Sequence, residues 1–196
     1  MKILLLGPYR ENLANYLKSL GDDVTHTEEP LQAGAEILDK KDFLISYGYR
    51  HILRKELLGR FPNRVINLHI SYLPWNRGAD PNLWSFIDDT PRGVTIHYID
   101  AGLDTGDILF QEELGYDPND TLRTSYEHLT EAIESLFIKV WPEIRVGKAK
   151  SYPQPAGGTA HRLKDRDRVE HLLINGWDTP VRDLIGKGTP VMQEVK

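Results

Sequence analysis

The sequence of 196 residues contains no cysteine, which excludes disulfides and thiolate metal sites. It also lacks a long apolar run, because the first one, residues 2–6, stops at Gly7 and Pro8. Such a run is too short for the apolar core of a signal peptide or for a membrane span. Positive charge is not in excess either, since the formal net charge is −5. We therefore expect a cytoplasmic protein whose main partner is neither a membrane nor a nucleic acid.

Apolar runs alternate with amphipathic segments in the first half of the chain. Residues 2–6, 42–47 and 64–69 are short apolar runs that end in glycine or polar residues, and residues 11–20 place leucine and alanine at helical spacing. Strands that alternate with helices favour right-handed βαβ units. The predicted fold class is α/β, with a Rossmann-like, mostly parallel sheet flanked by helices. Ligands of such sheets bind outside the carboxyl ends of the strands.

The second half has a different organisation. A loop rich in proline and glycine spans residues 71–82, and strands are predicted at 93–99 and 108–114 on either side of a turn. A long amphipathic helix is predicted within residues 121–146, and we expect it to bend or end near Pro142.

The composition shifts after residue 150. Prolines and glycines interrupt residues 153–158, and residues 161–171 are dense in charge. We predict one main domain over residues 1–150. Residues 151–196 are predicted to form a short C-terminal extension that packs on the core or lies at an interface between subunits.

Asn67 and His69 lie two residues apart at the end of a predicted strand. Side chains alternate along a strand, so these two point to one face while Ile66 and Leu68 point to the other. An amide and an imidazole then meet just before the irregular loop 71–82. Two interpretations stay open: a catalytic pair at a strand end, or a histidine held by hydrogen bonds in the core.

Asp104 lies in a turn, residues 100–107, that carries three carboxylates and two glycines. A solvated turn aspartate is the common case for such a residue. The spacing does not match a calcium-binding loop, so no metal is predicted. His97 alternates with Ile96 and Tyr98 on a predicted strand, which favours a structural role in packing.

Residues 7–10 (GPYR) join the first predicted strand to the first predicted helix. They carry one glycine where a dinucleotide fingerprint needs three. Either the turn simply connects the two elements, or the helix N-terminus beyond it holds an anion.

Four stretches, taken together in their order and spacing, resemble the formyltransferase family. They are residues 67–74 (NLHISYLP), 75–78 (WNRG), 93–97 (GVTIH) and 102–108 (GLDTGDI). The resemblance extends over residues 1–146 and implies the formyltransferase fold, so that residues 1–150 would form the catalytic domain. Methionyl-tRNA formyltransferase, glycinamide ribonucleotide formyltransferase and the nucleotide-sugar N-formyltransferases share this fold.

The resemblance implies that a substrate amine attacks the formyl carbon of 10-formyltetrahydrofolate without help from a metal. Asn67 would donate a hydrogen bond to the developing oxyanion, a contact worth about 3–4 kcal/mol in other enzymes. His69 would stabilise that charge and assist proton transfer. Asp104 would orient His69 and help move a proton to the leaving folate nitrogen. Folate contacts are implied at His51, Ile52, Leu53, Asp100 and Gly102.

Within the family, the nucleotide-sugar N-formyltransferases fit best. Residues 158–165 (GTAHRLKD) are similar to a segment that follows the core of those enzymes, of which a pseudaminic acid pathway enzyme is one example. The implied substrate is a nucleotide-linked amino-deoxy sugar for surface polysaccharide or glycan synthesis, and the implied assembly is a homodimer. The candidate contacts to that substrate are Tyr9, Arg10, Asn76, Arg77 and Gly78.

Other readings stay open at this point. The same chemistry could act on an aminoacyl-tRNA, an aminoacyl carrier or glycinamide ribonucleotide, although Ile70 stands where enzymes of the last class have proline. A folate- or nucleotide-binding module without activity is a further alternative. Arg10 and Arg77 could be ordinary surface charges.

Overall fold

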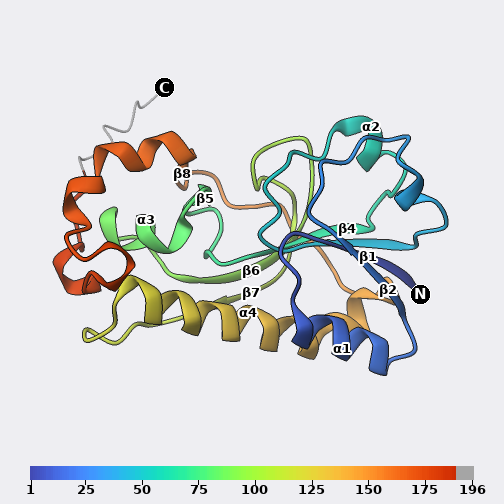
Figure 1. The fold of residues 1–196 in the computed structure, drawn as a ribbon, viewed down its shortest axis with the longest axis horizontal. Coiled ribbons are helices and arrows are strands. Elements are labelled where there is room, and N and C mark those ends of the chain that lie inside the picture. The colour runs from blue at the N-terminus through green and yellow to red at the C-terminus, as the bar shows by residue number, and fades with distance from the viewer. Residues whose placement is uncertain (189–196) are drawn as a thin grey trace.

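The structure, a computed structural model, describes residues 1–188. A six-stranded sheet in the order β2-β1-β3-β4-β6-β7 forms its centre (Figure 1). The first four of these strands run parallel, and β6 and β7 are antiparallel to their neighbours. The strands are β1 (Lys2–Leu6), β2 (Asp23–Thr27), β3 (Phe43–Ser46), β4 (Val65–His69), β6 (Gly93–Tyr98) and β7 (Ile108–Glu113).

The parallel half of the sheet follows from strands that are apolar on both faces. All four residues of β3 are buried, as are the last four of β1. Strands of this kind need helices on both sides to shield them from water. The predicted α/β fold with a mostly parallel sheet is confirmed, and β6 and β7 extend that sheet in antiparallel fashion.

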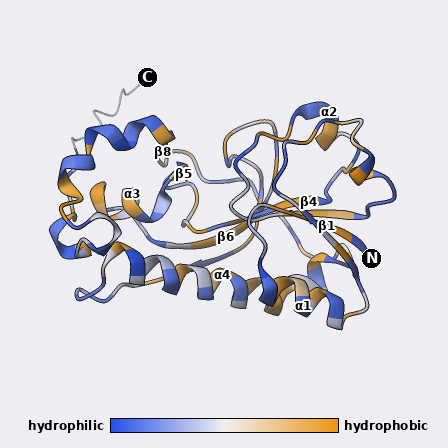
Figure 2. Cartoon of the chain, viewed as in Figure 1, coloured by the Kyte–Doolittle hydropathy of each residue, from blue (hydrophilic) through white to orange (hydrophobic). Residues whose placement is uncertain are grey.

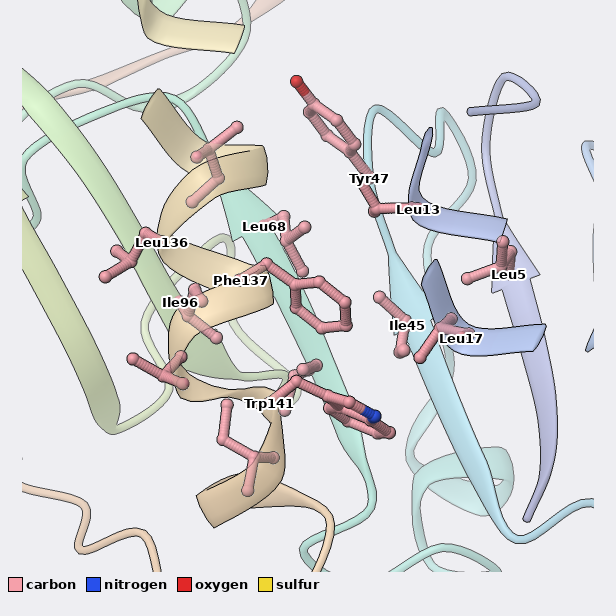
Figure 3. Close-up of a cluster of buried hydrophobic side chains, with 14 of the residues drawn as sticks. Leu5, Leu13, Leu17, Ile45, Tyr47, Leu68, Ile96, Leu136, Phe137 and Trp141 are labelled. Carbon is pink, nitrogen blue, oxygen red and sulfur yellow. The ribbon is translucent and has the colours of Figure 1, made fainter. Parts of the chain in front are cut away.

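Two helices, α1 (Glu11–Ser19) and α4 (Leu122–Ile144), cover one face of the sheet (Figure 1). Both carry apolar residues interspersed with polar ones (Figure 2), as expected for helices with one buried side. Phe137 and Trp141 reach from α4 toward the strands and α1 (Figure 3), and both are fully buried. The helix continues past Pro142 to its end two residues later, at Ile144.

The opposite face carries two smaller apolar clusters. Alternate residues of β1 separate the faces, because Ile3 and Leu5 join the large cluster while Leu4 and Leu6 join one beside α2 (Lys55–Leu58). The second cluster surrounds α3 (Pro81–Ile87). The cluster beside α2 and the cluster around α3 lie beneath the two ends of the site described below.

The C-terminal extension packs on the core, which is one of the two arrangements predicted for it. Its strand β8 (Ala160–His161) pairs in parallel with β5 (Arg77–Gly78). Further along, short 3₁₀ helices bring Val169, Val181 and Leu184 against α3 and the start of α4. Residues 189–196 of the predicted extension lie outside the described residues. Within residues 1–188, no helix is long and apolar enough to cross a membrane.

Candidate active site

Asn67 and His69 lie at the carboxyl end of strand β4, on the face opposite Ile66 and Leu68, as their spacing predicted. The antiparallel pairing of β4 with β6 places His97 directly opposite Asn67. The amide nitrogen of Asn67 donates to Oδ1 of Asp104 at 3.1 Å and lies 3.3 Å from Nε2 of His97. The predicted residues therefore meet in one polar cluster.

Asp104 is not a solvated turn residue, because its side chain is only 15% exposed. Its Oδ2 accepts a hydrogen bond from the backbone N–H of Gly78 at 2.9 Å and lies 3.8 Å from Nδ1 of His69. Burial by itself would raise the pKa of Asp104, but the facing imidazoles of His69 and His97 and the Gly78 N–H outweigh it. They hold the pKa of Asp104 well below its usual range, so this carboxyl is charged at neutral pH.

His69 is buried, and this burial lowers its pKa below the ordinary value, although the Asp104 carboxylate opposes the shift. Its Nε2 lies 3.3 Å from the backbone carbonyl of Asn76, a contact in which the ring nitrogen must donate. His69 is therefore neutral near pH 7 and faces a fixed negative charge. This is the arrangement of a group that accepts a proton and is stabilised once it has done so.

His97 is the member of the cluster that the sequence analysis assigned to packing. It is almost fully buried, and its Nδ1 lies 2.8 Å from the Tyr98 carbonyl, to which it must donate. Its Nε2 is then left to accept from the Asn67 amide and lies 3.5 Å from Oδ1 of Asp104. The packing interpretation was incomplete, because His97 also holds the Asn67 amide in place.

Gly78 holds Asp104 through a backbone that other residues adopt with difficulty. Its φ is +90°, in the left-handed region, and a Cβ at this position would collide with the carbonyl oxygen of His161. Glycine is therefore required both by conformation and by the close approach of β8. The turn around Gly78 supplies a backbone donor to the reaction centre.

A cavity of about 1090 Å³ opens onto the cluster. Its walls include every residue for which folate contacts were implied, and also Arg10 and Gly78 from the substrate candidates. A volume of this size has room for more than one small molecule. The residues with implied folate contacts that line it are His51, Ile52, Leu53, Asp100 and Gly102.

Three of the predicted substrate contacts do not line the cavity. Tyr9 is half exposed and packs edge-on against His26. Asn76 is fully buried, and its amide binds the hydroxyls of Thr90 and Thr159. The guanidinium of Arg77 donates twice to Gln154.

The loop turns the side chains of Asn76 and Arg77 toward protein partners, so these predicted substrate contacts lie away from the cavity lining. Asn76 nevertheless serves the site through its carbonyl, which lies against His69. Arg10 does face the cavity, with its guanidinium over the ring of Tyr47 at 4.5 Å.

The extension supplies contacts that the sequence did not indicate. The Gln154 amide donates to the backbone carbonyls of Asp104, at 2.7 Å, and Gly106, at 2.9 Å. Thr159 accepts from the backbone N–H of Asn76 at 2.9 Å. A segment remote in sequence thereby fixes both loops that bear on His69. The signals available were the similarity of residues 158–165 to a segment of the nucleotide-sugar enzymes and the density of charge at residues 161–171, and arginines from that region do line the cavity.

Within residues 1–188, no group of three or more His, Asp or Glu side chains is arranged to hold a metal ion. The polar centre consists of neutral His69, charged Asp104 and the amide of Asn67, with His97 beside them. They stand at the carboxyl end of a parallel strand above a cavity for small molecules. Fold and site together define a Rossmann-like α/β protein with the equipment for proton transfer at a bound substrate.

The chain belongs to the formyl transferase family: the family model described as "Formyl transferase" matches residues 18–141. The predicted family is thereby confirmed. Among solved structures, the chain is similar to the formyltransferase PseJ from Anoxybacillus kamchatkensis, with 58% identity and a TM-score of 0.95. The match covers 96% of this chain and 100% of that one. The PseJ structure is a complex with UDP-4,6-dideoxy-4-formamido-L-AltNAc and tetrahydrofolate.

More distant relatives share the fold. A 4-N formyltransferase from Francisella tularensis is 24% identical, with a TM-score of 0.73 over 85% of this chain and 78% of that one. Methionyl-tRNA formyltransferase of Paraburkholderia phymatum is 33% identical over 162 residues, which is 79% of this chain. That match covers 48% of the relative, so the chain spans about half the length of the curated relatives it matches.

Proposed function

We propose that the protein transfers the formyl group of 10-formyltetrahydrofolate to the amine of a nucleotide-linked amino-deoxy sugar. The observation that carries this proposal is the 58% identity over the full length of PseJ, whose complex holds a UDP-linked formamido sugar and tetrahydrofolate. In that bound sugar the formamido group is on carbon 4 of a 4,6-dideoxy sugar. A UDP-linked 4-amino-4,6-dideoxy sugar is therefore the first substrate to test.

The folate supplies an activated formyl carbon, and the residues of the chain do the rest. His69, neutral and buried, takes the proton that the attacking amine releases, and that proton passes to the folate nitrogen as its bond to the formyl carbon breaks and tetrahydrofolate leaves. Asp104 remains charged and stabilises the imidazolium so formed, across the 3.8 Å that separates Oδ2 from Nδ1. We assign the oxyanion contact to the amide of Asn67. Because Asp104 and His97 already share that amide, one of these contacts must lengthen for the donation to occur.

The residues present fit a folate at the α2 end of the cavity. The loop after β3, including His51 and Leu53, and the loop at Asp100 and Gly102 both line the cavity that holds the reaction centre. Ile52, a residue that is 82% exposed, offers an apolar surface at this end. A flat, partly apolar ring system needs walls of this type with backbone groups to hydrogen-bond its edges.

The experiment supplies the purified full-length chain with 10-formyltetrahydrofolate and one amine at a time. Release of tetrahydrofolate and a mass gain of one carbonyl group are followed for UDP-linked 4-amino-4,6-dideoxy sugars, other nucleotide-linked amino sugars and charged initiator tRNA. We expect turnover with a UDP-linked sugar, and no turnover with the His69→Ala variant. Turnover with the tRNA alone would overturn the proposed substrate, and no turnover with any amine would overturn the activity.

A homodimer and a cytoplasmic location stay predictions from the sequence. Sedimentation of the purified protein tests the first, and fractionation of cells that express the chain tests the second.

A further inference from the structure

The cavity ends, on the side away from α2, in a wall that the proposed chemistry does not use. Its residues come from the start of α4, from the 3₁₀ helix η2 (Leu163–Arg168) with Arg162 just before it, and from the 3₁₀ helix η4 (Gly176–Asp178). We call it the extension wall, and its members are Arg123, Tyr126, Arg162, Leu163, Arg166 and Trp177.

The extension wall combines positive charge with exposed rings. Three of its six residues are arginines, in a chain whose net charge is −5. Tyr126 and Trp177 keep 41% and 39% of their surface exposed beside them. Guanidinium groups match phosphate oxygens, and exposed aromatic faces stack on nucleobases. This pairing of chemistries at one end of a cavity is the signature of a nucleotide site rather than of a purely apolar ligand.

The arginines of this wall differ in how far carboxylates already neutralise them. Arg123 pairs with Asp178 at 2.7 Å, and Arg166 with Glu170 at 3.3 Å. Arg166 also lies 3.7 Å from Asp80, which lines the same cavity and would otherwise repel an anion. Within residues 1–188, Arg162 has no carboxylate within ion-pairing distance of its guanidinium.

We propose that the extension wall binds the nucleoside diphosphate of the sugar substrate, with Arg162 on the phosphates and Trp177 against the base. The inference rests on the proposed function, which requires a folate and a nucleotide-linked sugar to meet at His69. With the folate at the α2 end, the nucleotide lies toward the opposite end. The sugar then spans the middle of the cavity, with its amine near His69. The substrate contacts that the sequence predicted at Asn76 and Arg77 are thus assigned to residues of the extension.

The test measures binding of UDP and of tetrahydrofolate separately, by titration calorimetry, to the full chain and its variants. We expect Arg162→Ala to weaken UDP binding by about 10- to 100-fold, the effect of losing a charge-assisted hydrogen bond. Trp177→Ala should weaken it by about 5- to 100-fold through lost stacking. Tetrahydrofolate binding should not change in either variant.

Arg168→Ala is the matched control, because Arg168 lies in η2, which begins directly after Arg162, pairs with Asp165 and is absent from the cavity lining. It should bind UDP as the unaltered protein does. Unchanged UDP binding in Arg162→Ala, or an equal loss of UDP and tetrahydrofolate binding, would overturn the inference.

The two proposals fail in different ways. If UDP binds and depends on Arg162 while no sugar is formylated, the extension wall stands and the proposed function falls. If a UDP-linked sugar is formylated and Arg162→Ala leaves its KM unchanged, the function stands and the extension wall falls.

Discussion

Gln154 donates a hydrogen bond from its side-chain amide to the backbone carbonyl of Asp104, 2.7 Å away. Fifty residues separate the two along the chain. The same side chain also accepts two hydrogen bonds from the guanidinium of Arg77. One amide of the extension thus ties together the loop that carries Asp104 and the loop that carries Gly78.

This tie predicts a positioning role for Gln154. Gln154→Ala should lower kcat by about 10-fold, because small displacements of a reacting group are costly in rate. The KM for either substrate should change little, since Gln154 does not line the cavity. Steady-state kinetics measure both constants.

The control for that variant is Gln32→Ala, which alters an exposed glutamine far from the site in sequence. It should leave kcat and KM as they are. A Gln154→Ala protein with normal kcat but reduced thermal stability would assign Gln154 to folding alone.

Substitutions within the reaction centre should lower kcat much more. His69→Ala and Asp104→Asn should each lower kcat by about 100- to 10,000-fold, the range for loss of a general base or of the group that supports it. Circular dichroism should show both variants folded, because the two apolar clusters beneath the cavity are untouched. Near-normal turnover by Asp104→Asn would contradict the role assigned to that carboxylate.

The lowered pKa of His69 predicts that turnover falls on the acid side. The ring is neutral above its ordinary pKa of about 6.5 and gains a proton only at a lower pH in the folded protein. Catalysis should therefore hold from pH 8 to about 6.5 and decline below that range. A profile of kcat against pH whose fall on the acid side begins above pH 6.5 would count against His69, with its lowered pKa, as the base.

The same two residues predict how stability responds to acid. An unfolded chain protonates His69 below about pH 6.5, before the folded protein does, so this contribution to stability is present above that pH and lost as the pH falls. Asp104, whose pKa is held low, contributes above about pH 3.9 and loses that contribution at lower pH. Thermal unfolding between pH 8 and 5 should show a smaller drop in Tm for His69→Gln than for the unaltered protein.

Gly78→Ala should destabilise the protein and reduce turnover together. A left-handed conformation costs a residue with a Cβ about 1–3 kcal/mol, and here the Cβ also meets the His161 carbonyl. At about 2–4 °C for each kcal/mol, the Tm should fall by several degrees. Gly157→Ala is the control, because its φ of +95° carries the same strain while open space surrounds its Cβ position. A drop no larger than that of Gly157→Ala would exclude the steric conflict.

The sequence predicted the sheet well where one strand contains the whole signal. The apolar runs of β1, β3 and β4 and the same-face spacing of Asn67 and His69 are local patterns, and the structure reproduces them. Asp104 was predicted as a site residue only through the family resemblance, because the sequence of a turn does not reveal which distant residues its aspartate contacts.

The remainder depends on contacts between distant segments. His97 faces Asn67 because of an antiparallel register that no single strand reveals. The side chains of Asn76 and Arg77 point inward because Thr159 and Gln154 bind them, and a loop sequence alone does not disclose such partners. The extension lacks a periodic pattern, so the pairing of β8 with β5 and the contacts of Gln154 with the Asp104 loop could not be predicted from it.

The pairing of β8 with β5 has a consequence for the order in which parts of the molecule fold. The hydrogen bond from Asn76 to Thr159 closes a loop of 83 residues, and contacts of such long range are the slow ones to form. A nascent chain can therefore assemble its sheet while Gly78 and Asn76 still lack their supports. Proteolytic cleavage within residues 151–158 of the folded protein should leave the sheet folded and abolish turnover. The extension therefore completes the site after the sheet has formed.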